Sequence, residues 1–410
     1  MGRMKRRSFL TAAGLAPWAW ARPRIEGGRR ALREETPPAE SYGSYDPWIE
    51  VDLAAIAFNI RQIERKTARR PILAVLKCNA YGHGLVETAK YLEKLPVRGI
   101  AVGKLNEAVT LRQAGLRGMI LNLGPFGPDD TALIVRQDIS QSAYTDAVLT
   151  LDQTAKALNK RAKVHVKIDT GLGRVGVHHE AALAFLRRVA RLPHIVVEGV
   201  FHSFSEDPEF DLVQHRRFLA VTDAARREGL SLGLRHAAAS TAIFRYGEEF
   251  FLDMVRPGIS IYGHYPTEEE HRLKRLELRP ALSLKTRASL VKDIVPGESL
   301  SYFRKFVAEK PERILTAALG YADGIPLELA QGAQGLVRGR CFPFIGEVTA
   351  SHSYIRVTGR PDIRTGDEIV LIGRQDGAEI ALWGLAQAVK KSDYKILIGL
   401  SPALRRIYRA

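Results

Sequence analysis

The stretch AVLKCNAYGHG, residues 74–84, raises the question of what its lysine is doing there. Lys77 closes an apolar run, residues 72–76, whose β-branched and aliphatic composition predicts a buried strand. Small and turn-forming residues follow it at once, among them Gly82 and Gly84. A charge at the mouth of a buried strand is either solvated or placed for chemistry, and the rest of the chain has to distinguish the two.

Outward from this stretch, short apolar runs alternate with amphipathic segments. The apolar runs predict strands at Trp48–Val51, Ile72–Leu76, Gly99–Val102, Met119–Leu123, Asp138–Ser142, Val164–Ile168, Ile195–Phe201, Leu234–Ala237 and Ile259–Tyr262. The amphipathic segments predict helices at Leu53–Thr67, Leu85–Lys94, Leu105–Ala114, Thr145–Asn159, Glu180–Arg191 and Asp211–Arg227. Strict alternation of strand and helix indicates a parallel sheet with crossover helices, and the number of units favours a closed (β/α)8 barrel, expected at residues 47–275.

From residue 276 onward the sequence pattern changes to short apolar runs separated by turn residues. We therefore expect a mostly β second domain at residues 276–410. Strands are predicted at Leu282–Val291, Arg313–Leu319, Gly335–Val337, Cys341–Val348, Tyr354–Val357, Glu368–Ile372 and Glu379–Ala381, with one helical stretch at Trp383–Lys391. The early strands are followed by neither GxGxxG nor GxxxxGK[ST], which argues against a dinucleotide or P-loop site.

Composition narrows the function classes. A chain of 410 residues that is 46% hydrophobic can bury a large core and favours two domains. Its two cysteines, Cys78 and Cys341, are too few for a disulfide framework or a zinc site, so no metal is expected. No apolar run is long enough to predict a membrane span. The net charge of +16 lacks any accompanying nucleic-acid motif, so no nucleic-acid partner is expected.

The first 46 residues are expected to be a transport signal followed by a flexible tether. The chain starts with basic residues, carries Arg6 and Arg7 before Ser-Phe-Leu, and offers Ala19 and Ala21 as a small-x-small cleavage site. This pattern resembles a twin-arginine signal, which predicts export to the periplasm. The alternative is a basic disordered N-terminus on a cytoplasmic protein.

In a (β/α)8 barrel the chemistry sits at the carboxyl ends of the strands, so charged and polar residues there become candidates. The candidates are Lys77, Lys167 with Asp169 and Arg174, His202 with Ser203, His236 with Ser240, and Arg256 with Gly258. A single lysine at a strand end is usually solvated. Several such positions around one barrel mouth favour a functional site.

At Lys77 the sequence resembles a family. AVLKCNAYGHG closely resembles the cofactor-lysine motif of alanine racemases, the fold-type III pyridoxal phosphate (PLP) enzymes. Five further stretches resemble other motifs of the same family, in the same order. They are VHVKIDTGLGRVGV (164–177), RHAAAS (235–240), DMVRPGISIYG (253–263), LSY (300–302) and LGYADG (319–324). The resemblance runs from about residue 48 to the C-terminus.

The resemblance implies a cofactor site. Lys77 would hold PLP as a Schiff base. The cofactor phosphate would be bound by Tyr81, Ser240 and the backbone around Gly258 and Ile259.

The resemblance also implies the catalytic and substrate groups. Arg256 would face the pyridine nitrogen as a fixed cation. Lys77 and Tyr302, the latter from a second subunit, would serve as acid and base on the two faces of the substrate, which implies a homodimer with shared sites. Arg174 would bind the substrate carboxylate, and Lys167, carbamylated in many relatives, would orient it.

The sequence departs from the family pattern in three places. Ser203 stands where the family usually has a histidine against the cofactor ring. Ala350 and Ser351 replace a Met-Asp pair that lines the substrate carboxylate site, and Pro402 replaces a tyrosine packed over the substrate. These changes concern the preferred amino acid more than the binding of PLP.

The expected function is therefore a PLP-dependent amino acid racemase, most simply an alanine racemase that acts on L- and D-alanine. A broad-specificity racemase and a non-catalytic PLP-binding protein remain alternatives, because the departures lie on the substrate side. A decarboxylase of related fold would need a glycine-rich phosphate loop and a Cys-Glu-x-x-Asp tract, neither of which is visible.

Overall fold

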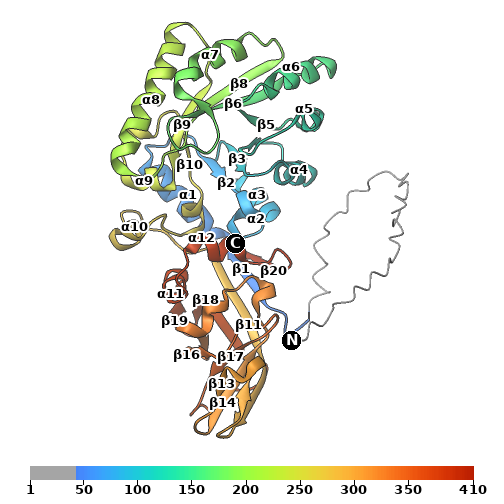
Figure 1. Ribbon diagram of the computed structural model, residues 1–410, viewed down its shortest axis with the longest axis vertical. Coiled ribbons are helices and arrows are strands. Elements are labelled where there is room, and N and C mark those ends of the chain that lie inside the picture. Colours follow the sequence, from blue (N-terminus) through green and yellow to red (C-terminus); the bar gives the residue numbers. More distant parts are fainter. Residues whose placement is uncertain (1–42) are drawn as a thin grey trace, which may run out of the picture. The chain divides into compact units, whose positions relative to one another are not determined.

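The structure is a computed structural model that describes residues 43–410, so the predicted export signal lies outside the described residues. Its first part is an eight-stranded parallel sheet in the order β10-β9-β8-β6-β5-β4-β3-β2 (Figure 1). The strands are β2 (Leu73–Val75), β3 (Gly99–Val102), β4 (Met119–Asn122), β5 (Ser140–Ala143), β6 (Ala162–Asp169), β8 (Ile195–Phe201), β9 (Leu234–Ala239) and β10 (Met254–Arg256), and the short β7 (Val177–His178) pairs with β6.

Parallel bonding between the two end strands brings the sheet close to a closed barrel. Ile72 and Val255 form a parallel bridge. Beside it the N–H of Val75 donates to the carbonyl of Pro257 at 3.0 Å, and the N–H of Val255 donates to that of Pro71 at 3.0 Å. The barrel predicted from the β/α alternation is thereby confirmed, with its strand ends gathered at one rim.

Helices cover the outside of the barrel strands (Figure 1). The helices are α1 (Leu53–Lys66), α3 (Leu85–Leu92), α4 (Leu105–Gln113), α5 (Thr131–Arg136), α6 (Ala147–Ala157), α7 (His179–Ala190), α8 (Pro208–Arg227), α9 (Ser240–Arg245) and α10 (Glu268–Leu273). The short segment labelled α2 (Lys77–Tyr81) is a left-handed turn rather than a regular helix. Helix α1 shows why they form: Asp52 accepts a bond from the N–H of Ala55 at 2.8 Å, and Ile56, Ile60 and Ile63 make one buried stripe. No helix of residues 43–410 is long and apolar enough to cross a membrane.

The second part is a nine-stranded sheet in the order β19-β18-β15-β16-β17-β14-β11-β1-β20. Its strands are β1 (Trp48–Asp52), β11 (Leu282–Ile294), β14 (Glu312–Ala317), β15 (Gln334–Val337), β16 (Arg340–Ile345), β17 (Ser353–Arg356), β18 (Glu368–Gln375), β19 (Ala378–Ile380) and β20 (Arg405–Arg409). A hairpin of β12 (Ser299–Leu300) and β13 (Phe306–Val307) and the helices α11 (Leu382–Ala388) and α12 (Asp393–Gly399) complete it.

Two strand predictions for the barrel were wrong. The segment from Trp48 forms a strand, β1, but it pairs antiparallel with β11 and parallel with β20 in the second sheet. Its buried and open residues alternate, as is typical of a sheet covered on one face only. The segment Ile259–Tyr262 is a 3₁₀ helix, because Pro257 and Gly258 end the strand β10 and prevent it from continuing. The domain limits at 47, 275 and 276 stay predictions.

The turn after β2 is fastened to the C-terminal segment of the chain. The side chain of Arg406 donates from Nε to the carbonyl of Gly82 at 2.9 Å, and the hydroxyl of Tyr408 donates to the carbonyl of His83 at 3.1 Å. A Cβ at Gly82 would collide with the carbonyl oxygen of Leu397 in α12. Gly82 also has φ +84°, which disfavours any side chain. The glycine therefore lets α12 approach the turn that carries Lys77.

We predict that Gly82→Ala destabilises the protein by about 1–3 kcal/mol more than Gly115→Ala, because the added methyl group meets immovable backbone. Gly115 is the matched control, since it also has positive φ but has nothing within 4 Å of the point that a Cβ would occupy. Urea unfolding of the two variants measures the difference. Equal losses of unfolding free energy would contradict the close approach of α12.

Candidate active site

A cavity of about 380 Å³ opens at the carboxyl ends of the barrel strands. Its volume falls in the range of small-molecule sites. The lining residues include Lys77, Tyr81, Arg174, Ser203, Ser240, Arg256, Gly258 and Ile259, as well as Phe204, Glu206, Asp211, Thr241 and Tyr394. Six of the strand-end residues that the sequence singled out therefore converge on one space: Lys77, Arg174, Ser203, Ser240, Arg256 and Gly258.

Lys77 starts a turn of unusual backbone conformation. Cys78, Asn79, Ala80 and Tyr81 all have φ between 51° and 56°, so four non-glycine residues in succession are left-handed. Such a conformation costs about 1–2 kcal/mol per residue. Tertiary hydrogen bonds offset the strain: the N–H of Asn79 donates to Glu107 Oε1 at 3.2 Å, and Asn79 Oδ1 accepts from the N–H of Leu85 at 2.8 Å.

This turn directs the side chains of Lys77 and Tyr81 into the same cavity. Lys77 Nζ lies 5.8 Å from the centroid of the Tyr81 ring. No carboxylate within residues 43–410 forms an ion pair with Lys77. Its amine is therefore available to a ligand in the cavity.

Lys167, at the end of β6, is a buried amine without a carboxylate partner in the described part of the chain. Only 5% of the residue is exposed, and Nζ lies 5.3 Å from the centroid of the Phe201 ring. Burial, and after it the charges of Arg174 and Arg256, lowers the pKa of Lys167 to about 8. Arg174 is exposed and lines the cavity. This part of the site is positively charged, so an anionic group of a ligand would bind favourably there.

Arg256, at the end of β10, is held by three acceptors. Its guanidinium donates to His236 Nδ1 at 2.8 Å, to the carbonyl of His202 at 2.8 Å and to that of Ala237 at 3.0 Å. Burial, with a smaller effect of Arg174, lowers the pKa of Arg256 to about 9, so it remains a cation at neutral pH. It is thus a fixed charge in the cavity wall.

A chain of imidazoles continues from Arg256 into the barrel. Because an arginine only donates, His236 Nδ1 must accept, and the proton of this neutral ring lies on Nε2. Nε2 then donates to His165 Nδ1 at 2.9 Å, and His165 Nε2 faces Glu198 Oε2 at 3.7 Å. Burial lowers the pKa of both histidines, which keeps the rings neutral. The hydrogen bonds from Arg256 to His236 and from His236 to His165 therefore each have a defined donor and acceptor.

Another part of the cavity wall is formed by hydroxyl groups and by the first residues of helix α9. Ser240 Oγ accepts from the N–H of Gly258 at 3.0 Å. A Cβ at Gly258 would lie 2.5 Å from the Tyr81 hydroxyl, so this position requires glycine. Helix α9 begins at Ser240 without a capping side chain, and its first residues line the cavity. The first N–H groups of an uncapped helix, with hydroxyl groups beside them, suit a phosphate.

The residues present therefore fit PLP. Lys77 offers an amine, Arg256 a fixed cation, and the Ser240–Gly258 end a phosphate cradle. Arg174 adds a positive charge in the cavity wall, and Lys167 lies close enough to Arg174 to be affected by its charge. The two carboxylates that line the cavity are both engaged: Glu206 accepts from Thr241 Oγ1, and Asp211 accepts from the hydroxyl of Tyr246. No cluster that could hold a metal ion occurs in residues 43–410. Fold and site together define a barrel enzyme of the PLP-dependent class.

Comparisons with known proteins give the family. A sequence model of the alanine racemase N-terminal domain matches residues 51–266, and one of the C-terminal domain matches residues 281–408. The alanine racemase of Halothermothrix orenii is 35% identical over 368 residues, covering 88% of this chain and 96% of that protein. That of Symbiobacterium thermophilum is 35% identical over 371 residues, covering 89% and 98%.

Solved structures agree. An alanine racemase of Clostridium difficile 630 is 31% identical, with a TM-score of 0.84 and coverage of 89% of this chain and 96% of that one. The Bacillus anthracis alanine racemase with bound L-Ala-P is also 31% identical, with a TM-score of 0.83 and coverage of 89% and 95%. The chain belongs to the alanine racemase family.

Eight of the residues singled out by the sequence do not line the cavity of their own chain: Lys167, Asp169, His202 and His236 near the barrel strand ends, and Tyr302, Ala350, Ser351 and Pro402 in the C-terminal part. Tyr302 is 70% exposed, in a short 3₁₀ helix (Tyr302–Arg304) between β12 and β13. Ala350 and Ser351 are exposed in the loop between β16 and β17, where the carbonyl of Ala350 accepts from the N–H of Ala322 at 3.0 Å. The roles predicted for Tyr302 and Ala350 stay predictions. Pro402 is also exposed, and its carbonyl accepts from Arg406.

Tyr394, which was not predicted from the sequence, lines the cavity from α12. The predicted helix at Trp383–Lys391 is present as α11, but α12 was not predicted. Ser392, whose side chain caps α12 by accepting from the N–H of Lys395, was the available signal for a helix start. Nothing in the local sequence indicates that this helix reaches the barrel.

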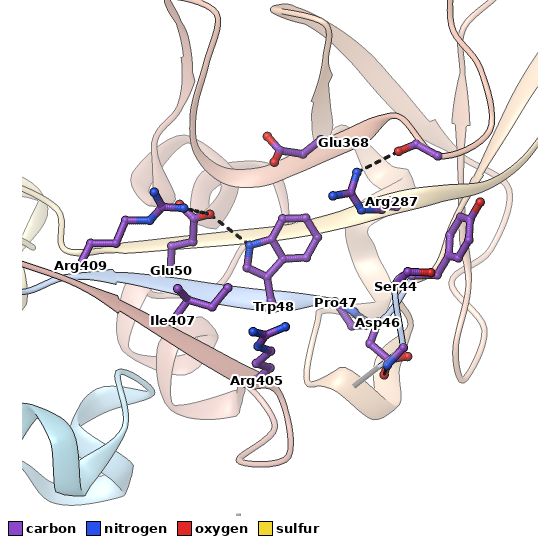
Figure 2. Close-up of a pocket in the computed structure, with 13 residues that line it drawn as sticks. Ser44, Asp46, Pro47, Trp48, Glu50, Arg287, Glu368, Arg405, Ile407 and Arg409 are labelled. Atoms are coloured by element: carbon purple, nitrogen blue, oxygen red, sulfur yellow. Dashed lines mark hydrogen bonds and ion pairs between the residues drawn. The ribbon is translucent and has the colours of Figure 1, made fainter. Parts of the chain in front are cut away.

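A second cavity, of about 650 Å³, lies at β1, β11 and β20 and shares no lining residue with the first (Figure 2). Its charges are largely paired. Figure 2 shows Trp48 and Arg409 both directed at Glu50 Oε1, at 3.2 and 3.0 Å. None of the residues predicted for chemistry lines it, so the barrel cavity is the candidate site.

We predict a pH-dependent stability effect of Lys167. Its folded pKa of about 8 lies below its ordinary value of 10.5, so between these values the unfolded chain binds a proton that the folded chain has lost. The contribution of this group to stability therefore rises with pH through that window, by up to about 3 kcal/mol. Between pH 7 and pH 10 the unfolding free energy of the wild type should rise relative to that of Lys167→Met.

Urea unfolding in CO₂-free buffer checks this, because a neutral amine can add CO₂. Lys94→Met, at an exposed position, controls for the loss of a charge as such. A difference between the wild type and Lys167→Met that stays constant with pH would contradict the buried, unpaired amine.

Proposed function

We propose that this protein interconverts L- and D-alanine with PLP as its cofactor. One observation carries the proposal: the unpaired amine of Lys77 opens into a cavity that also holds the fixed cation Arg256 and a phosphate cradle. The family comparisons point to the same activity.

Each residue has a task that follows from its place in the cavity. When bound, PLP supplies the electron sink that acidifies the Cα–H bond of an amino acid. Lys77 holds the cofactor and moves a proton to or from Cα on one face. Arg174, with Lys167 behind it, binds the substrate carboxylate, and Arg256 keeps a positive charge at the cofactor ring nitrogen.

We further propose that the second proton donor comes from another copy of the chain. Inversion at Cα needs an acid or base on each face, and Lys77 can serve only the face on which it lies. Tyr302 and Phe303 are 70% and 91% exposed between β12 and β13, where a partner can reach them. A homodimer that inserts Tyr302 into the partner's cavity supplies the second group and covers these rings.

Four positions depart from the family pattern on the substrate side: Ser203, Ala350, Ser351 and Pro402. Amino acids other than alanine should therefore also be tested as substrates. Ser203 is half-buried in the cavity wall and leaves more room than a histidine would. Incubation of the enzyme with each L-amino acid, followed by chiral chromatography, gives the preference. Inversion of no amino acid would refute the proposed racemase and leave the non-catalytic PLP binder.

We also propose that the protein is exported by the twin-arginine route, on the basis of Arg6, Arg7 and the Ala19–Ala21 site. Replacement of both arginines by lysine should leave the protein in the cytoplasm, whereas the unaltered chain should be found in the periplasm. Fractionation of expressing cells measures the distribution. Equal distributions of the two chains would contradict export by this route.

We predict that Tyr302→Phe lowers racemisation by a factor of about 10² to 10⁴ while the visible absorbance of bound cofactor remains. Lys77→Ala should lose both. Because the two groups of one site come from different chains, a mixture of the two inactive variants should regain activity in hybrid dimers, which have one intact site each. Neither variant alone should do so.

The mixture is prepared by dissociation and reassembly, and each variant treated alone in the same way is the control. Full activity of Tyr302→Phe would remove this tyrosine from the mechanism. An inactive mixture that contains hybrid dimers would instead contradict the sharing of sites.

A further inference from the structure

The cavity wall contains one carboxylate that forms no ion pair within residues 43–410. Glu206 lines the cavity from the loop between β8 and α8 and is exposed. Its Oε1 accepts a hydrogen bond from the neutral hydroxyl of Thr241 at 3.0 Å. The other carboxylate in the wall, Asp211, is buried and lies 3.8 Å from Arg245 Nη1. The charge of Glu206 is therefore available to a cationic group of a ligand.

The backbone holds Glu206 in a fixed position. Its φ is +71°, in the left-handed region that residues with a side chain rarely adopt. The N–H of Glu206 donates to Asp211 Oδ1 at 3.0 Å, and its carbonyl accepts from Arg245 Nη1 at 2.9 Å. Residues held in such conformations cluster at active sites and ligand-binding sites. The strained loop therefore indicates that the position of this carboxylate matters to a ligand.

Glu206 lies near the place that the proposed function gives to the substrate. Burial, and after it the charge of Glu206, raises the pKa of Tyr394 in the cavity wall. Arg174, which would bind the substrate carboxylate, lies in the loop after β6, and β6 and β8 are neighbours in the barrel sheet. Ser203 lines the cavity from the same loop as Glu206 and has a small side chain. An amino acid held at Arg174 can therefore extend its side chain toward Glu206.

We propose that the protein also racemises amino acids with a positively charged side chain, such as ornithine and lysine, and that Glu206 binds their terminal ammonium group. The inference rests on the proposed function and deepens it, because it names a further substrate class for the same site. The reaction is the same: one proton leaves Cα on one face, another is added on the opposite face, and the terminal ammonium group keeps its protons. The cavity offers cations to the carboxylate of such a substrate and an anion to its side chain.

Two other roles of Glu206 lead to different results. If Glu206 only held Thr241 at the start of α9, glutamine would replace it, because its amide oxygen also accepts this hydrogen bond. If a cation on a second copy of the chain paired with Glu206, the loss of its charge would affect all substrates alike. The variant Glu206→Gln separates these roles, since it removes the charge and keeps an acceptor.

The test compares L-ornithine with L-norleucine, which has a methyl group in place of the terminal ammonium group and the same chain length. Full-length enzyme supplied with PLP is incubated with each amino acid, and inversion is followed by chiral chromatography. The wild type should invert ornithine. Glu206→Gln should lower the ratio of kcat/KM for ornithine to kcat/KM for norleucine about tenfold or more, because only ornithine loses an ion pair. High salt should also lower this ratio in the wild type, since Glu206 is exposed.

The matched control is Glu209→Gln, which removes the same charge from an exposed position of α8 outside the cavity. It should leave the ratio unchanged. An unaltered ratio in Glu206→Gln, or a wild type that inverts alanine but not ornithine, would overturn the inference. The proposed function would survive either result, whereas a wild type that inverts no amino acid would overturn both.

Discussion

The left-handed turn from Cys78 to Tyr81 is the constraint on which the site depends. It starts at the end of β2 and sends Lys77 and Tyr81 into one cavity. Alone it would be unstable, since each of its residues is in a conformation that L-amino acids disfavour. Glu107 and Leu85 bind Asn79 at its centre, and α12 and β20 hold the residues that follow. Both parts of the fold are therefore needed to shape the site.

Excess positive charge is the second property of the site. Lys167 and Arg256 are each 5% exposed and have no carboxylate partner in the described part of the chain. Burial of such groups is costly unless a ligand compensates for it. The histidines behind Arg256 orient it without neutralising it, because both rings are neutral. Under the proposed function, a cofactor phosphate and a substrate carboxylate would compensate for this charge.

Much of the fold and of the candidate site could be predicted because strand ends in a barrel are close in space though distant in sequence. Lys77, Arg174, Ser240 and Arg256 were found in this way, and all line the cavity. The sheet to which β1 belongs could not be predicted, since an apolar run does not indicate with which strand it will pair. Tyr394 could not be found either, because only tertiary packing carries α12 to the barrel. The left-handed turn ran against local preference and had no sequence signal.

The account stands on the covalent attachment of the cofactor to Lys77. Borohydride reduction of the purified protein, followed by proteolysis and mass spectrometry, tests it most directly, because reduction makes the bond between amine and cofactor permanent. The account predicts a single pyridoxyl group, on the peptide that contains Lys77. A pyridoxyl group on another lysine, or none on a protein supplied with PLP, would contradict it.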